Sequence, residues 1–365
     1  MELSALQLSE ENFFTDFPVV LTATKLQQPQ QDSPIATTII DRKMIEASGF
    51  TEIADLMRLA PGMLVNYDGN QPVTGYPFLF HKYTVRMQVL VDGRSVYTPI
   101  FGEMPWTQLG ITIDDIERIE VLRGPSSSSY GPNAMTGVIS IITRHASLDR
   151  GPKIKINYGN KGLREEFIRY GNKAGKFDYK LSIGNRQSEG FDAREDDTDI
   201  SIINFRGDYQ VTQNDNLVFH LTYNSGEFDQ EEGISPSWNN PVHERDILHQ
   251  EQHVKWIHTF ENNNEFVLQY YHQKRVDNNN YLTDPVPLTA ETLDIAGNII
   301  FVNENVTTER QNLEISHTLH DHNYSISYGI IFREDMTEAP QYLYQSDIDT
   351  ISTEQAFINA EYQLN

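Results

Sequence analysis

The chain has 365 residues and a formal net charge of −24, and this acidity argues against nucleic-acid binding, which depends on Lys and Arg. It contains no cysteine, so disulfides, thiol catalysis and cysteine-ligated metal sites are excluded. No apolar run approaches the roughly 20 residues of a membrane-spanning helix, although the alternating strands of a membrane β-barrel would escape that test. The N-terminal residues lack the charged and apolar regions of a signal peptide, which is expected if a signal has been removed or if the chain starts inside a longer gene.

The first segment with a helical pattern is TEIADLMRLAPG, residues 51–62. Thr51 fits the N-cap position. Pro61-Gly62 is a typical helix end, because proline cannot continue the helix and glycine accepts the left-handed conformation. The segment carries four apolar residues at helical spacing: Ile53, Leu56, Met57 and Ala60. We therefore predict a short helix with one buried face.

Strand signals follow this helix. MQVLVDGRSVY, residues 87–97, predicts a hairpin in which Asp92-Gly93 supplies the positive φ angles of a tight turn. TIDDIERIEVLRG, residues 112–124, predicts a short acidic helical turn followed by a strand. Residues 121–143 read as two apolar strands joined by a Gly/Ser/Pro-rich crossing. These elements indicate a small α/β domain.

After Gly151 the pattern changes to strict alternation of apolar and polar residues, which is typical of strands with one apolar and one polar face. In KIKINYG the apolar face carries Ile154, Ile156 and Tyr158. The same alternation recurs in FDYKLSIGN, NLVFHLTYN and NYSISYGII. A half-buried sheet in a soluble sandwich would give this pattern, and so would a membrane barrel.

The lengths of the connections favour the barrel. Short connections near Ala174, Asn214, Asn263 and His322 alternate with longer ones at Ser188–Asp199, Glu227–Leu248 and Asp277–Val306. Short turns on one side and long loops on the other describe an outer-membrane barrel with its apolar residues toward lipid. We count about ten strands, and we expect the barrel to be incomplete in this chain, because an open sheet in a membrane would leave unpaired edges.

Four ordered segments resemble the plug domain of TonB-dependent outer-membrane receptors. They are VVLTATK from Val19, LAPGMLV from Leu59, MQVLVDGRSVY from Met87 and IERIEVLRGPSSSSYGPNAMTGVISIIT from Ile116. The resemblance implies a membrane β-barrel, antiparallel, with an N-terminal α/β plug domain. It divides the chain into an N-terminal segment (1–33), a plug (34–148) and the first strands of the transmembrane barrel (149–365).

The resemblance also implies a function. Members of this family lie in the outer membrane of Gram-negative bacteria and import scarce nutrients such as ferric siderophores, haem, cobalamin or sugars, driven through TonB by the proton gradient. We therefore expect a transporter without a cofactor and not an enzyme. Its partners would be the TonB C-terminal domain, outer-membrane lipid and a small-molecule substrate. The alternatives are a passive or surface-receptor barrel with a permanently seated plug, and a soluble periplasmic binding or adhesion protein.

FPVVLTATK resembles the TonB box, the segment that binds TonB. The residues that this implies are Val19, Val20, Leu21, Thr22 and Ala23. A short β-prone segment between a helix-like flank and a Gln-rich flank is suited to adding itself as a strand to a partner's sheet. The alternative is that these residues form the first strand of the plug.

By the same resemblance, Glu120 and Arg123 belong to ionic contacts between the plug and the barrel. The Gly/Ser run that follows them does not fit a phosphate-binding loop, because six residues separate Gly124 from Gly131 and a proline comes next. No nucleophile elbow surrounds its serines, so a catalytic serine is not expected either.

Ligand contacts are expected from two apical loops of the plug, at residues 67–75 and 97–106. The aromatic residues in and next to these loops would either stack on a chelate or sugar or pack into the plug's own core: Tyr67, Tyr76, Tyr97, Phe101 and Trp106.

Two stretches carry residue types that bind metals. The acidic stretch Asp192–Asp199 lacks the Asp/Asn-Gly-Glu frame of a calcium loop. The stretch His243–His249 offers imidazoles, but charged loops of this kind are usually just solvated. We therefore predict no resident metal, and calcium in the extracellular loops remains the alternative.

Overall fold

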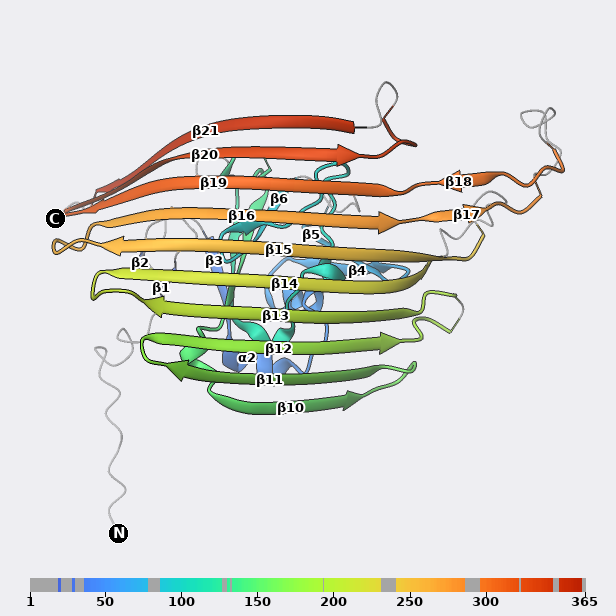
Figure 1. Ribbon diagram of the computed structural model, residues 1–365, viewed down its shortest axis with the longest axis horizontal. Helices are drawn as coiled ribbons and strands as arrows, with labels where there is room; N and C mark the ends of the chain where they lie inside the picture. The colour runs from blue at the N-terminus through green and yellow to red at the C-terminus, as the bar shows by residue number, and fades with distance from the viewer. Residues whose placement is uncertain are drawn as a thin grey trace, which may run out of the picture.

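The computed structural model describes residues 19–20, 28–29, 36–77, 86–126, 130–131, 133–192, 194–230, 241–285, 296–321, 323–343 and 348–362. Its two main parts are a broad sheet of ten strands and a smaller α/β domain that lies against one face of that sheet (Figure 1). The predicted combination of an α/β plug and an antiparallel barrel sheet is confirmed. No helix in the described part of the chain is long and apolar enough to cross a membrane.

The plug is built on a five-stranded sheet with the order β3-β8-β9-β6-β7. Its strands are β3 (Ala36–Asp41), β6 (Met87–Val91), β7 (Arg94–Ser95), β8 (Ile116–Arg123) and β9 (Gly137–Thr143). The β6–β9 pair is parallel and the other pairs are antiparallel. One apolar core, which includes Leu56, Ile119 and Ile139, joins this sheet to the short helices.

The remaining elements of the plug are short. They are α2 (Arg42–Ser48), η2 (Ala54–Leu59), β4 (Leu64–Asp68), β5 (Gln71–Gly75), η3 (Trp106–Gln108), η4 (Ile113–Asp115) and η5 (Ala146–Leu148). Helix α2 is capped at its N-terminus by Asp41, whose carboxylate accepts a hydrogen bond from the Met44 amide at 2.8 Å, and at its C-terminus by Gly49 with φ 67°.

The helix predicted at residues 51–62 is only partly correct. The structure has the 3₁₀ helix η2 there, preceded by Ile53 without a side-chain cap, so Thr51 is not the N-cap. The buried face is the predicted one, since Ile53, Leu56, Met57 and Ala60 are all buried. The segment is short because Pro61 holds the preceding Ala60 in an extended conformation, with ψ 125°.

The hairpins of the plug match their sequence signals. Strands β6 and β7 are joined by Asp92 and Gly93, which have φ values of 48° and 87°, as a tight two-residue turn requires. Strands β8 and β9 pair along the segment predicted as two apolar strands. At Gly137 the two strands approach so closely that a Cβ would lie 2.3 Å from the Leu122 carbonyl oxygen.

The barrel sheet contains ten antiparallel strands in chain order. They are β10 (Gly151–Tyr158), β11 (Arg164–Ala174), β12 (Phe177–Ser188), β13 (Thr198–Gln210), β14 (Asp215–Gln230), β15 (His243–Thr259), β16 (Glu265–Asn278), β19 (Val306–His320), β20 (Tyr324–Glu338) and β21 (Ile348–Tyr362). The sheet is open, because β10 and β21 are its two ends and do not pair with each other.

The predicted alternation of the barrel strands is confirmed. In β10 the apolar Ile154 and Ile156 are 69% and 54% exposed, whereas Lys153 and Lys155, which alternate with them, are partly covered. Figure 1 shows the plug on one side of the sheet only. The polar residues of each strand therefore face the plug, and the apolar residues face outward, as they would toward lipid.

Short and long connections alternate as predicted, with one correction. The connection predicted at Glu227–Leu248 is shorter, because β14 continues to Gln230 and β15 starts at His243. The long connection between β16 and β19 carries a hairpin of its own, β17 (Asn280–Leu282) and β18 (Phe301–Asn303).

Candidate functional site: the contact between plug and barrel

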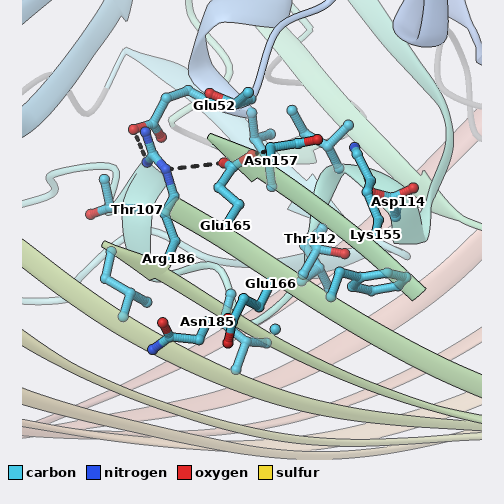
Figure 2. A pocket seen from close by; sticks show the side chains of 18 of the residues that line it. Glu52, Thr107, Thr112, Asp114, Lys155, Asn157, Glu165, Glu166, Asn185 and Arg186 are labelled. Atoms are coloured by element: carbon cyan, nitrogen blue, oxygen red, sulfur yellow. Dashed lines mark hydrogen bonds and ion pairs between the residues drawn. The ribbon is translucent and has the colours of Figure 1, made fainter. Parts of the chain in front are cut away.

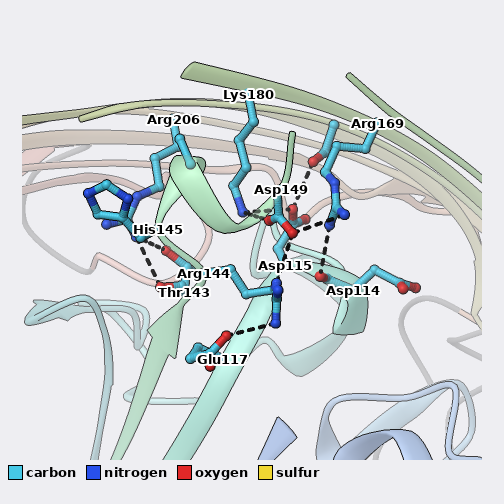
Figure 3. A network of polar contacts seen from close by, with 12 residues as sticks. Asp114, Asp115, Glu117, Thr143, Arg144, His145, Asp149, Arg169, Lys180 and Arg206 are labelled. Carbon is cyan, nitrogen blue, oxygen red and sulfur yellow. Dashed lines mark hydrogen bonds and ion pairs between the residues drawn. The ribbon is translucent and has the colours of Figure 1, made fainter. Parts of the chain in front are cut away.

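The most heavily charged contact between plug and barrel surrounds Asp149, which precedes β10 (Figure 3). Its side chain is 0% exposed and accepts from Lys180 Nζ of β12 at 2.8 Å. It also pairs with Arg169 of β11 at 2.9 Å and with Arg144 of the plug at 2.8 Å. Burial opposes ionisation of this carboxyl, but Lys180 and the two arginines outweigh it and hold the pKa of Asp149 below its usual value.

Two neighbouring aspartates extend this contact along the same side of the plug. Asp114 pairs with Lys153 and Lys155 of β10 at 2.6 and 2.9 Å. Asp115 accepts a hydrogen bond from Ser182 of β12 at 2.8 Å. Burial opposes ionisation of Asp114 too, but the hydrogen bonds from the two lysines keep its pKa lowered.

We call these residues the anchor cluster: Asp114, Asp115, Asp149, Lys153, Lys155, Arg169 and Lys180. Its carboxylates belong to the plug and the loop that follows, and its cations belong to the first three barrel strands. Arg206 of β13 continues the same contact by donating to the Thr143 carbonyl oxygen at 3.0 Å.

A second, smaller set of contacts lies at the β7 edge of the plug sheet. Arg94 of β7 is 1% exposed and forms an ion pair with Glu251 of β15. Arg310 of β19 donates to the carbonyl oxygen of Tyr97 at 3.2 Å, and its guanidinium lies 4.9 Å from the centroid of the Tyr97 ring. The plug is thus held on two walls of the sheet by unequal sets of charges.

The two residues predicted to contact the barrel lie on β8. Glu120 is 0% exposed and accepts from Arg118 on the same strand at 2.8 Å. The Nε atom of Arg123 is buried and has no hydrogen-bond partner among the described residues. The role of Glu120 and Arg123 as plug–barrel contacts therefore stays a prediction.

Sequence reasoning missed the anchor cluster although both halves of its signal were present. The acidic turn before β8 was recognised, and it contains Asp114 and Asp115. Alternation placed Lys153 and Lys155 on the polar face of the first barrel strand. Pairing the lysines on the lumen face with the acidic turn of the plug would have predicted this contact.

The aromatic ligand candidates lie in different surroundings. The Tyr67 hydroxyl donates to Asp55 at 2.9 Å, and its ring meets that of Phe191 in a long barrel connection at 6.5 Å. Burial, reinforced by Asp55, raises the pKa of Tyr67. Phe101 makes an edge contact with Tyr342 at 5.0 Å.

Two other candidates pack inside the plug. Trp106 is 3% exposed and belongs to the apolar core. Tyr76 packs partly buried against the same core. For both, the structure agrees with the packing alternative given above. Tyr67 also packs partly against this core but, like Tyr97 and Phe101, contacts a barrel residue as well.

A cavity of about 90 Å³ lies between the plug and strands β10–β13 (Figure 2). Arg186 of β12 points into it and contacts the carboxylates of Glu52 in the plug and Glu165 in β11, the latter at 3.2 Å. The indole nitrogen of Trp106, which also lines the cavity, has no hydrogen-bond partner among the described residues.

The segment predicted to bind TonB is described only in part. Strand β1 (Val19–Val20) pairs with β2 (Gln28–Pro29) in a two-stranded sheet separate from the plug sheet. The described residues therefore do not support the alternative of a first plug strand. Leu21, Thr22 and Ala23 lie outside the described residues.

One group of carboxylates comes together near the long connections. Glu227, Glu244 and Asp246 have oxygen atoms within 4.8 Å of one another, and all three residues are exposed. Exposed acidic groups of this kind are common without an ion. His243, from the stretch weighed for metal binding, contacts Pro241 and Asn279 instead.

Comparisons with known proteins agree with this architecture. A protein-family profile described as "TonB-dependent Receptor Plug Domain" matches residues 29–138. The chain is 28% identical over 188 residues to the vitamin B12 transporter BtuB of Vibrio vulnificus, covering 51% of this chain and 30% of that protein. It is 33% identical over 146 residues to an iron-regulated outer membrane virulence protein of Vibrio cholerae, covering 39% of this chain and 22% of the relative. The matches thus span less than a third of the length of these relatives.

Solved structures extend the likeness to the barrel. The siderophore receptor PirA of Acinetobacter baumannii superposes with a TM-score of 0.65 at 14% identity, over 90% of this chain and 54% of that one. FpvA of P. aeruginosa, solved with a heterologous pyoverdine, gives 0.70 at 12% identity, over 95% and 52%. Residues 29–138 are thus similar to the plug domain of TonB-dependent receptors, and the chain as a whole shares its fold with receptors of this kind.

Proposed function

We propose that this protein imports a scarce nutrient across the outer membrane and that TonB drives the import by pulling on the N-terminal segment. The observation that carries the proposal is the nature of the contact between plug and barrel. It consists largely of ion pairs and hydrogen bonds, such as Lys180–Asp149 and Arg94–Glu251, in place of a continuous apolar interface. Such contacts hold a plug in one orientation, yet water can replace them when the plug moves.

The separate pairing of β1 supports the role of the TonB-box-like segment. A strand that is not built into the plug sheet is free to add to a partner's sheet through its main-chain hydrogen bonds. We infer that Val19, Val20, Leu21, Thr22 and Ala23 make this contact.

The relatives suggest two classes of cargo. One is named as a vitamin B12 transporter and another as an iron-regulated protein, and the solved neighbour PirA is a siderophore receptor. We propose cobalamin or an iron chelate as the cargo of this protein. The aromatic residues at the plug–barrel boundary, Tyr67, Tyr97 and Phe101, are the proposed contacts.

Binding of a Thr15–Leu26 peptide to a purified TonB C-terminal domain tests the energised mechanism. Micromolar binding that is lost with Val20→Pro and kept with Val20→Thr is expected, because proline removes a main-chain donor while threonine keeps the β-branch. If none of these peptides binds, the protein is a receptor with a permanently seated plug. Uptake of labelled cyanocobalamin and of radioactive iron chelates by cells carrying the protein then separates the two cargo classes.

A further inference from the structure

Three cavities follow one another along the wall formed by β15, β16 and β19. The first holds about 390 Å³ and the next two about 30 and 10 Å³. On β16 their linings use successive inward-facing residues: Glu265, Val267, Gln269 and Tyr271, then Gln273 and Arg275, then Asp277. At about 3.3 Å per residue this row extends roughly 40 Å, which exceeds the hydrocarbon thickness of roughly 30 Å.

The ends of this row lie on opposite sides of the barrel. Glu265 adjoins the short turn between β15 and β16, and Asp277 adjoins the long connection between β16 and β19. In outer-membrane barrels short turns face the periplasm and long loops face outward. The row of cavities therefore runs from the periplasmic end of the lumen to its outer end.

The large cavity is separated from the small ones by the contacts of one short plug strand, β7, and the residues after it. Arg94 reaches Glu251 of β15, which lies between His253 of the large cavity and His249 of the next. Glu251 is also bound by Gln273 at 2.6 Å. These side chains close the β15–β16 half of the row.

Arg310 closes the other half. It lies on β19 between Asn312, which lines the large cavity, and Thr308, which lines the next one. It donates to the carbonyl oxygen of Tyr97 at 3.2 Å and to that of Ser95 at 3.4 Å. Both contacts, Arg94 with Glu251 and Arg310 with Ser95 and Tyr97, therefore involve β7 and the residues directly after it.

Strand β7 is suited to moving. It has two residues, it is an edge strand of the plug sheet, and it pairs only with Leu90 and Val91 of β6. With so few backbone hydrogen bonds, β7 is held mainly by the side-chain contacts of Arg94 and Ser95, which are both buried. The anchor cluster, by contrast, holds the β8 and β9 side of the plug to β10–β12.

The β6–β7 turn also covers polar groups that have no partners. Asp92 lies 3.7 Å from His220 Nδ1, and Gly93 packs against the Gln269 amide. The Nε2 atom of His220, both ring nitrogens of His253 and the Nε2 atom of Gln269 lack hydrogen bonds among the described residues. His220, His253 and Gln269 also line the large cavity, so this turn forms part of its wall.

We propose that the cargo of this receptor passes along the β15–β16–β19 wall, and that β7 is the gate, closed by Arg94–Glu251 and by Arg310 on Tyr97. The inference rests on the import function proposed above. The opposite wall, at the anchor cluster, stays closed during transport.

Single-channel conductance of the receptor with a closed barrel, measured in planar lipid bilayers, tests the route without TonB or cargo. The variant Arg94→Ala/Glu251→Ala removes both partners of the gate pair, so that neither charge is left unpaired, and Asp92, which Arg94 also contacts at 3.5 Å, keeps its hydrogen bonds from Thr143. Arg310→Gln is a second gate variant, in which Asp335 keeps Arg333 at 3.1 Å. Glu52→Ala/Arg186→Ala, a plug–barrel pair on the β12 side, is the matched control. Heat-dependent gel mobility verifies that each variant is folded.

The route itself is mapped with a cationic methanethiosulfonate reagent, because the chain has no cysteine of its own. We expect the conductance of both gate variants to be several-fold higher than that of the unmodified receptor, and the conductance of the control variant to be unchanged. The reagent should lower this conductance strongly at Gln269→Cys and leave it unchanged at Ser182→Cys, which lies at the anchor cluster. Folded gate variants as closed as the unmodified receptor, or a current that responds at Ser182→Cys and not at Gln269→Cys, would overturn the proposal. Neither result depends on TonB, so a failure of peptide binding remains a separate finding.

Discussion

Replacing Asp149 by alanine should release the plug far more easily than replacing its lysine partner. Asp149 forms ion pairs with three cations. One of them, Lys180, is fully buried and has Asp115, at 3.8 Å, as its second carboxylate partner. Breaking a buried pair by removing one partner costs about 3–5 kcal/mol. At about 1.4 kcal/mol per factor of ten, this raises the open population of the plug roughly 10²- to 10³·⁵-fold.

Lys180→Met should cost less, about 1.5–3 kcal/mol for a lost charge-assisted hydrogen bond, because Arg144 and Arg169 still neutralise Asp149. The measurement is the rate of thiol labelling of an Ala54→Cys reporter, which is fully buried in the plug, over a urea series. Glu261→Ala, an exposed turn carboxylate, is the control and should change the rate little. If Lys180→Met is as damaging as Asp149→Ala, or if Asp149→Ala labels at the unmodified rate, the reasoning about the shared carboxylate is wrong.

The same reporter checks three further predictions. Asp114 and Asp149 have lowered pKa values, so their contribution to plug stability is complete above the unfolded pKa of about 3.9 and is lost as pH falls through the lower folded values. Because only the thiolate reacts, the labelling rate is divided at each pH by that of the urea-unfolded protein; this ratio should be constant from about pH 8 to 5 and rise below about pH 4, and a rise near neutral pH would contradict this. Trp106→Ala should cost about 3–5 kcal/mol of plug stability, and an unchanged stability with weaker ligand binding would instead favour a ligand contact. Gly137→Ala should destabilise the plug by about 1–3 kcal/mol, because its Cβ would meet the Leu122 carbonyl at 2.3 Å; wild-type labelling would refute that close approach.

The elements that could be predicted from the sequence are those whose causes are local. The hairpin at Asp92-Gly93 follows from two residues with positive φ, and the strand at Gly151–Tyr158 follows from alternation within eight residues. The helix at residues 51–62 was predicted less well, because its periodicity fixes the buried face but does not distinguish an α-helix from the 3₁₀ turns seen there.

The charged contacts could not be predicted in the same way, because they depend on how two separately folded parts dock. Arg94 and Glu251 are 157 residues apart, and Lys153 and Asp114 are 39 apart. Alternation predicts that a lysine faces the lumen, but it does not predict which plug residue lies opposite that lysine along the barrel axis. At Glu120 the ion pair with Arg118 lies along its own strand, two residues away, and the contact of Glu120 with the barrel stays a prediction.

The plug makes more charged contacts with strands β10–β12 than with β15 and β19, and this difference affects how the plug can move. The plug continues directly into β10 at Gly151, and the anchor cluster binds it to β10–β12 next to that connection. The anchor cluster adjoins the ends of β8 and β9, so in the sheet order β3-β8-β9-β6-β7 the edge strand β7 lies farther from the cluster than the edge strand β3 and moves more when the plug turns about the cluster. A displacement of the plug is therefore concentrated where the Arg94–Glu251 pair meets the row of cavities, while the strong contacts beside Gly151 return the plug to its seat afterwards.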